Sequence, residues 1–87
     1  MSIVRNVHTR QSLGSRIEEA LDTMIADGLL DAWGTEVDDD DGHMTYWIEG
    51  SRPCKGYYPP RDMSLGTHGK TASWLAHWHP DYFYHDR

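Results

Sequence analysis

Apolar residues recur three and four positions apart between Ile17 and Ile25, which is the spacing of one face of an amphipathic helix. The apolar stripe consists of Ile17, Ala20, Leu21, Met24 and Ile25. Ser15 and Glu18 have the spacing of a capping box, and Gly28 suits the left-handed position that follows a helix. The sequence therefore predicts a helix that begins at Ser15 and ends before Gly28.

Two runs rich in aromatic and β-branched residues follow this helix, from Asp31 to Val37 and from His43 to Glu49. In the second run, one face of the expected strand carries Met44, Tyr46 and Ile48. Such alternation is typical of a strand with one buried side. The Asp41-Gly42 pair between the runs supplies the positive φ angles of a turn. The pattern predicts a β-hairpin.

Three further segments complete the expected fold. Residues 3–8 alternate in the manner of a short strand. Thr71 to Trp78 form a second expected helix, with Trp74, Leu75 and Trp78 on one side. Residues 81–87 form an aromatic tail whose conformation the sequence leaves open. We expect one α+β domain over residues 1–87, in the order strand, helix, hairpin, loop and helix.

The segment between the hairpin and the second helix, residues 50–69, is rich in Gly and Pro. A free loop of this length is uncommon inside a compact domain, so it is interpreted as a long ordered loop. Tyr57 and Tyr58 are the residues expected to hold it against the body of the domain.

The chain has 87 residues, which suffices for one small core. Cys54 is its single cysteine, so no intrachain disulfide can form, and a reducing, cytoplasmic location is expected. The sequence offers no signal-peptide pattern and no apolar run that would span a bilayer, so no membrane partner is expected. Chains of this size often gain stability by pairing, so a homodimer is a further expectation.

Charge is distributed very unevenly along the chain, whose formal net charge is -6. The stretch from Ile17 to Ser51 contains no Lys or Arg. Its acidic residues are Glu18, Glu19, Asp22, Asp27, Asp31, Glu36, Asp38, Asp39, Asp40, Asp41 and Glu49. Such a surface repels phosphates and anionic lipids, so direct nucleic-acid binding is not expected. The predicted partner is a protein with a basic surface, such as a component of a nucleic-acid-binding complex.

Two groups of residues are the candidates for contact with that partner. The acidic candidates are Glu18, Glu19, Asp22, Asp38, Asp39, Asp40 and Asp41. The aromatic candidates are Tyr82, Phe83 and Tyr84, because such side chains often anchor interfaces. The four Trp residues are expected to lie mostly in the core.

A small acidic single domain of this kind resembles the accessory proteins and inhibitors that phages encode, among them anti-CRISPR proteins and other DNA mimics. The resemblance implies a module that blocks a basic nucleic-acid-binding partner, in the host cytoplasm if the chain is phage-encoded. It implies no cofactor. No catalytic motif is present: there is no Gly-x-Ser-x-Gly sequence, and Cys54 has no adjacent His. We therefore expect no enzymatic activity.

Residues from Ser15 to Glu49 also resemble the second half of a winged-helix domain, in which a helix leads into a β-hairpin wing. The matching features are the amphipathic helix, the Gly28-Leu29-Leu30 connection and the Asp41-Gly42 turn. The resemblance implies a regulatory protein that acts within a complex. DNA-reading winged helices carry basic residues on these elements, whereas this chain carries acidic ones.

Three ligand-binding patterns are incomplete. An EF-hand loop with Gly42 at its sixth position would place Val37 and Ile48 where ligands are required. The segment Gly66 to Thr71 resembles the tail of a phosphate-binding loop, but Ser64 replaces its first glycine and no buried strand is predicted before it. A small zinc site is the third functional hypothesis, with the candidate ligands His77, His79, Asp81 and His85.

Overall fold

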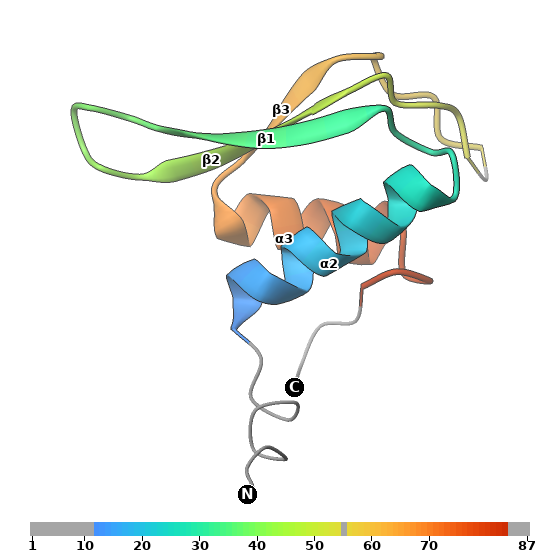
Figure 1. The fold of residues 1–87 in the computed structure, drawn as a ribbon, viewed down its shortest axis with the longest axis horizontal. Coiled ribbons are helices and arrows are strands. Elements are labelled where there is room, and N and C mark those ends of the chain that lie inside the picture. Colours follow the sequence, from blue (N-terminus) through green and yellow to red (C-terminus); the bar gives the residue numbers. More distant parts are fainter. Residues whose placement is uncertain (1–11, 55, 84–87) are drawn as a thin grey trace, which may run out of the picture.

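The computed structural model describes residues 12–54 and 56–83. Their elements are helix α2 (Leu13–Ala26), strands β1 (Ala32–Val37), β2 (Met44–Glu49) and β3 (Met63–Gly66), and helix α3 (His68–Trp78). The strands form one antiparallel sheet in the order β1-β2-β3, and both helices cover the same face of it (Figure 1). The α+β class is confirmed. The strand expected at residues 3–8 lies outside the described residues.

Helix α2 begins before the position predicted from the capping box. Ser12 is its N-cap, and the Ser12 hydroxyl accepts a hydrogen bond from the Ser15 backbone N–H at 3.1 Å. Ser15 thus lies inside the first turn, and its own N–H is the group that the Ser12 side chain satisfies. At the other end Gly28 has a φ of 84° and Leu29 donates to the Met24 carbonyl at 2.8 Å, a Schellman motif that confirms the predicted end.

The hairpin is confirmed, with a connection longer than a two-residue turn. In its register Trp33 lies opposite Ile48 and Val37 lies opposite Met44. The Asp38 N–H donates to the His43 carbonyl at 2.8 Å, and Gly42 has a φ of 73°. The positive φ predicted for the Asp-Gly pair is therefore present.

Strand β3 lies inside the segment that was expected to be a loop. It pairs with β2, placing Met63 opposite Ile48 and Ser64 opposite Trp47. Its four residues bury only one apolar side chain, Leu65. A strand this short has too few alternations to be recognised, and its partner strand rather than its own sequence defines it.

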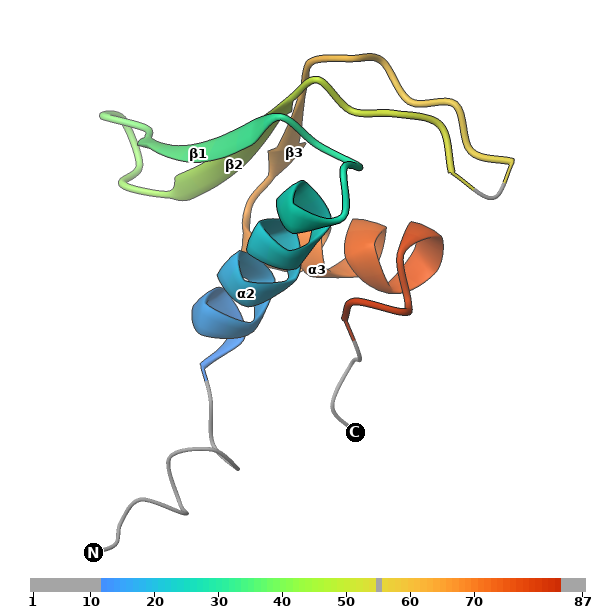
Figure 2. The same cartoon turned by 45° about the vertical axis from the view of Figure 1, so that its right-hand side comes forward.

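Residues 50–54 and 56–62 form a loop between β2 and β3 that extends beyond the sheet (Figure 2). The Tyr57 ring stacks on Trp78 with centroids 4.1 Å apart, and its hydroxyl accepts from the Trp74 indole N–H at 2.9 Å. Tyr58, by contrast, is 78% exposed. Tyr57 alone therefore performs the role that was expected of both tyrosines. Helix α3 also begins earlier than predicted, at His68.

A single layer of apolar side chains fills the space between the sheet and the helices. Its fully or nearly fully buried members are Ile17, Ala20, Leu21, Met24, Leu30, Tyr46, Ile48, Leu65, Ala72, Leu75 and Phe83. Trp33 and Trp74 pack at its border, and Trp78 is exposed. The tryptophans were expected in the core, but the aliphatic residues of α2 and α3 fill it and leave the indoles at its margin.

Candidate functional site

The acidic candidates lie on two elements, and we call them the acidic face. Its members are Glu18, Glu19, Asp22, Asp38, Asp39, Asp40 and Asp41, all of them exposed. The first three lie on α2 and the others form the hairpin loop. Helix α2 and strand β1 lie on the same side of the molecule, and the loop extends past the helices at one end of the sheet (Figure 1).

The carboxylates of α2 lie where the helix meets the sheet. Asp22 accepts a hydrogen bond from the Trp33 indole N–H at 2.8 Å, which ties the acidic side of α2 to β1. Burial raises the pKa of the Tyr46 hydroxyl, and the nearby negative charge of Glu18 raises it further. Asp22 thus has a structural contact that the sequence did not reveal. Asp22 therefore lies beside β1, and Glu18, one helical turn earlier, lies near Tyr46 of β2.

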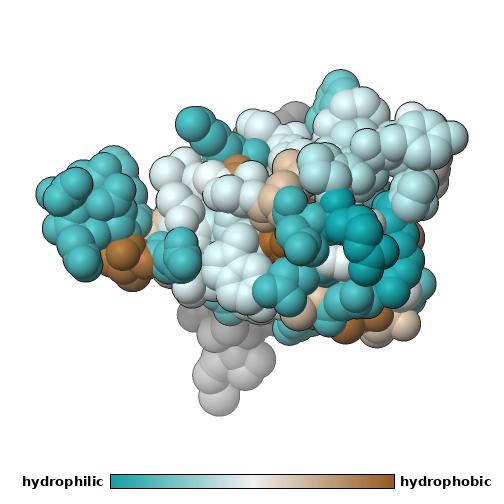
Figure 3. Space-filling model, turned by 90° about the horizontal axis from the view of Figure 1, so that it is seen from above, coloured by the Kyte–Doolittle hydropathy of each residue, from teal (hydrophilic) through white to brown (hydrophobic). Residues whose placement is uncertain are grey.

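The four carboxylates of the hairpin loop divide into two pairs. Asp38 accepts from the Asp40 backbone N–H at 2.9 Å, and Asp41 accepts from the His43 backbone N–H at 3.0 Å. These two side chains stabilise the loop itself. Within the described ranges, the side chains of Asp39 and Asp40 make no hydrogen bond or ion pair. The loop forms a hydrophilic end that stands clear of the paler surface over the sheet (Figure 3).

Basic side chains gather at the opposite end of β1. Arg52 forms an ion pair with Asp31 at 2.7 Å, and Arg61 approaches the same carboxylate at 4.0 Å. Among residues 12–54 and 56–83, no Lys or Arg forms an ion pair with the acidic face. The one basic side chain of this part of the chain that contacts the acidic face is His43, whose Nδ1 lies 3.4 Å from the Asp41 carboxylate.

The aromatic tail packs against α2. Phe83 is buried, with the guanidinium carbon of Arg16 4.8 Å from the centre of its ring. The Tyr82 hydroxyl donates to the Asp27 carboxylate at 2.7 Å. Phe83 is therefore a core residue rather than an exposed interface anchor, and Tyr82 closes the tail onto the end of α2. Tyr84 lies outside the described residues.

The Tyr82 contact predicts an alkaline loss of stability. The pKa of Tyr82 is raised from 10.0 to about 12. The hydrogen bond to the Asp27 carboxylate is the largest cause, and burial of the hydroxyl is the second. A group with a raised folded-state pKa stabilises the fold fully below pH 10 and loses that contribution as the pH rises toward 12. Tyr82→Phe should cost about 1 kcal/mol at neutral pH. It should also make the decline of unfolding free energy above pH 10 shallower, as measured by urea titration. An equally steep decline in the variant would contradict this role.

The zinc candidates do not form a cluster in the described residues. His79 is buried against the Trp74 ring, with centroids 4.8 Å apart, whereas His77 and Asp81 are exposed. His85 lies outside the described residues. Across the part of the chain that can be described, no group of three or more His, Cys, Asp or Glu side chains could hold a metal ion.

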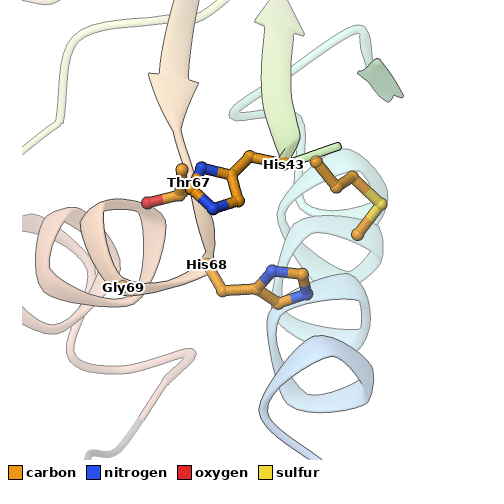
Figure 4. Close-up of a pocket in the computed structure, with 5 residues that line it drawn as sticks. His43, Thr67, His68 and Gly69 are labelled. Atoms are coloured by element: carbon orange, nitrogen blue, oxygen red, sulfur yellow. The ribbon is translucent and has the colours of Figure 1, made fainter. Parts of the chain in front are cut away.

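A pocket of about 250 Å³ lies where the hairpin meets the start of α3. Figure 4 shows His43, from the end of the hairpin loop, beside Thr67 and His68, which begin the helix. The His68 Nε2 atom is 3.2 Å from the Tyr46 hydroxyl. Strand β3 ends at Gly66, so it overlaps the start of the segment that resembles a phosphate-binding loop, with Ser64 inside the strand. Ser64 still replaces its first glycine, and the motif remains incomplete.

No protein-family model, curated protein or solved structure matches this chain. Among the described residues, no helix is long and apolar enough to cross a membrane.

Proposed function

We propose that this protein acts by stoichiometric binding, with its acidic face occupying a basic surface of a partner protein in the manner of a DNA mimic. The observation that carries the proposal is the set of exposed carboxylates on α2 and the hairpin loop, which no Lys or Arg of the described residues neutralises. Such a partner is a protein that ordinarily binds nucleic acid through Lys and Arg side chains.

Repulsion between the neighbouring carboxylates of the hairpin loop destabilises the fold, and this supports a functional interpretation of the acidic face. Like charges on neighbouring residues of a loop repel one another, and Asp39 and Asp40 offer no contact in return within the described residues. An exposed carboxylate that contributes nothing to its own fold can still attract a basic partner over about a Debye length, roughly 10 Å at 0.1 M salt. The attraction accelerates encounter more than it strengthens the final complex.

The test neutralises the two loop carboxylates that have no structural contact. Asp39→Asn/Asp40→Asn should lower the association rate with the partner by about threefold at low salt, and the difference should vanish at high salt. The partner is first captured from the source cells with the wild-type protein and identified by mass spectrometry. Its association is then measured by surface plasmon resonance, and double-stranded DNA should compete with the wild-type protein for it.

A control with the same change of charge separates the acidic face from net charge alone. Asp62→Asn/Asp81→Asn also removes two exposed negative charges, but at positions outside the acidic face, one before β3 and one after α3. Asn at position 62 retains an oxygen that can accept from the Gly50 N–H, as Asp62 does at 3.1 Å. Equal association rates for the two double variants would show that the acidic face has no specific role.

A further inference from the structure

Strand β1 forms one edge of the sheet, because β2 pairs with it on one side and no strand of the described residues pairs with the other. The direction of its backbone groups follows from one hydrogen bond. The Asp38 N–H donates to the His43 carbonyl, so Asp38 and His43 form a hydrogen-bonded pair of the antiparallel ladder. Such pairs alternate along the ladder with pairs whose backbone groups point away from each other.

Every second residue of β1 therefore turns its N–H and C=O groups to the open edge. These residues are Trp33, Thr35 and Val37. The residues between them turn the same groups toward β2. An extended segment placed alongside β1 would find a row of donors and acceptors at the spacing that a neighbouring strand requires.

The edge also lacks the features that normally prevent strand addition. Between Ala32 and Val37 there is no Pro or Lys, and the register with β2 runs without a bulge. Val37 is 62% exposed. The one charged residue of the strand, Glu36, is acidic, and it favours a basic neighbour.

The surroundings of this edge select the occupant by charge. On the helix side Asp22 is bonded to Trp33 of β1, and Glu18 lies near Tyr46, which pairs with Thr35 of β1. The loop carboxylates lie at the end of β1. A second copy paired antiparallel through β1 would bring the α2 carboxylates of the two copies toward one another on the helix side, so repulsion between them disfavours a dimer of this kind at neutral pH. A segment with Lys or Arg at alternate positions can instead add in the phase that turns all its basic side chains to the helix side, toward α2.

We infer that β1 accepts an extended segment of the partner protein, with Lys or Arg at alternate positions, as an additional strand of the sheet. The backbone groups of Trp33, Thr35 and Val37 hold the segment, while Glu18 and Asp22 attract its basic side chains. The inference rests on the proposed function and states how the acidic face holds its partner.

The test uses a peptide of alternating Lys and Val that spans the six residues of β1. Amide hydrogen exchange is followed by nuclear magnetic resonance on the labelled full chain. The amides of Trp33, Thr35 and Val37 should exchange about tenfold more slowly with the peptide bound, whereas those of Gly34 and Glu36, already bonded to β2, should change little. A peptide of alternating Glu and Val should protect none of them.

Other results would overturn the inference and leave the proposed function standing. Peptide binding without protection of the three outward amides would mean that the acidic face attracts basic chains without adding a strand. Protection of these amides in the free protein, together with a dimer in sedimentation, would assign the edge to a second copy. In both cases the effect of Asp39→Asn/Asp40→Asn on partner association could still be observed.

A backbone variant supplies an independent measurement. Thr35→Pro removes an outward N–H but no hydrogen bond to β2, and should weaken peptide binding about tenfold, whereas Thr35→Val should bind as the wild type does. Because Pro can also disturb the strand, the affinity of the wild-type protein is measured for two N-methylated peptides as well. One carries N-methyl groups at the odd-numbered residues and the other at the even-numbered residues. At least one of the two methylated peptides should fail to bind, since N-methylation blocks the hydrogen bonds to β1 and leaves the charge unchanged. Equal affinity for the unmethylated peptide and the two methylated peptides would overturn the inference.

Discussion

Leu21→Ala is expected to lower the free energy of unfolding by about 3 kcal/mol. Leu21 lies in the middle of α2 and is 0% exposed, between the helix and the sheet. Truncation removes the transfer free energy of the lost carbons and leaves a cavity that neighbouring side chains can fill only in part. Urea unfolding followed by tryptophan fluorescence measures the loss, because Trp33 and Trp74 border the same core.

Glu19→Ala is the matched control on the same helix. Glu19 is exposed, and Ala is at least as good a helix former, so the free energy of unfolding should change by less than about 0.5 kcal/mol. Equal effects of the two substitutions would show that α2 does not pack through the Leu21 face. A domain of this size has only a few kcal/mol of stability, so the Leu21 variant should also be the more easily unfolded one in every binding assay.

The features that could be predicted from the sequence are those with a local signal. The helical spacing of Ile17, Leu21 and Met24 identified the buried face of α2, and all three are buried. Gly28 ended the helix as expected. The alternation of Tyr46 and Ile48 gave the buried face of β2. In each case the pattern repeats within a few residues, so that burial by any partner element produces the same periodicity.

The features that were missed depend on residues far apart in the chain. Strand β3 is defined by its pairing with β2, and its own four residues carry little pattern. Tyr82 contacts Asp27 across most of the chain, and no local pattern distinguishes a tail residue that closes onto a helix from one that is free to bind. The cap was misplaced because Ser12 and Ser15 both precede helical residues, and only the hydrogen bond shows which is the cap.

The acidic face was predicted as a set of residues but not as an arrangement. Composition was enough to identify the carboxylates of α2 and the hairpin loop. Only the structure shows which of these carboxylates make structural contacts. Asp22 accepts a hydrogen bond from the Trp33 indole, and Asp38 accepts one from the Asp40 backbone N–H. The open edge of β1 could not be predicted either, because the position of a strand at the edge of a sheet depends on which other strands join it.

Gly50→Ala should cost about 3 kcal/mol, through two effects that a matched glycine can separate. Gly50 follows β2 with a φ of 69°, where an L side chain is strained by about 1 to 2 kcal/mol. A Cβ at this position would also collide with the Asp31 carboxylate, which is held by its ion pair with Arg52 at 2.7 Å. Asp31 would therefore have to move and weaken its ion pair with Arg52.

Gly42→Ala provides the comparison, because Gly42 has a similar φ of 73° but a Cβ there would meet no atom within 4 Å. It should cost only the backbone strain, about 1 to 2 kcal/mol, in the same urea titration. Asp31→Gly should remove the collision, because it takes away the Asp31 Cβ as well as the carboxylate. Gly50→Ala should then cost no more in that background than Gly42→Ala does in the wild type. Equal costs of Gly50→Ala with and without the Asp31 side chain would contradict the collision and leave backbone strain as the whole effect.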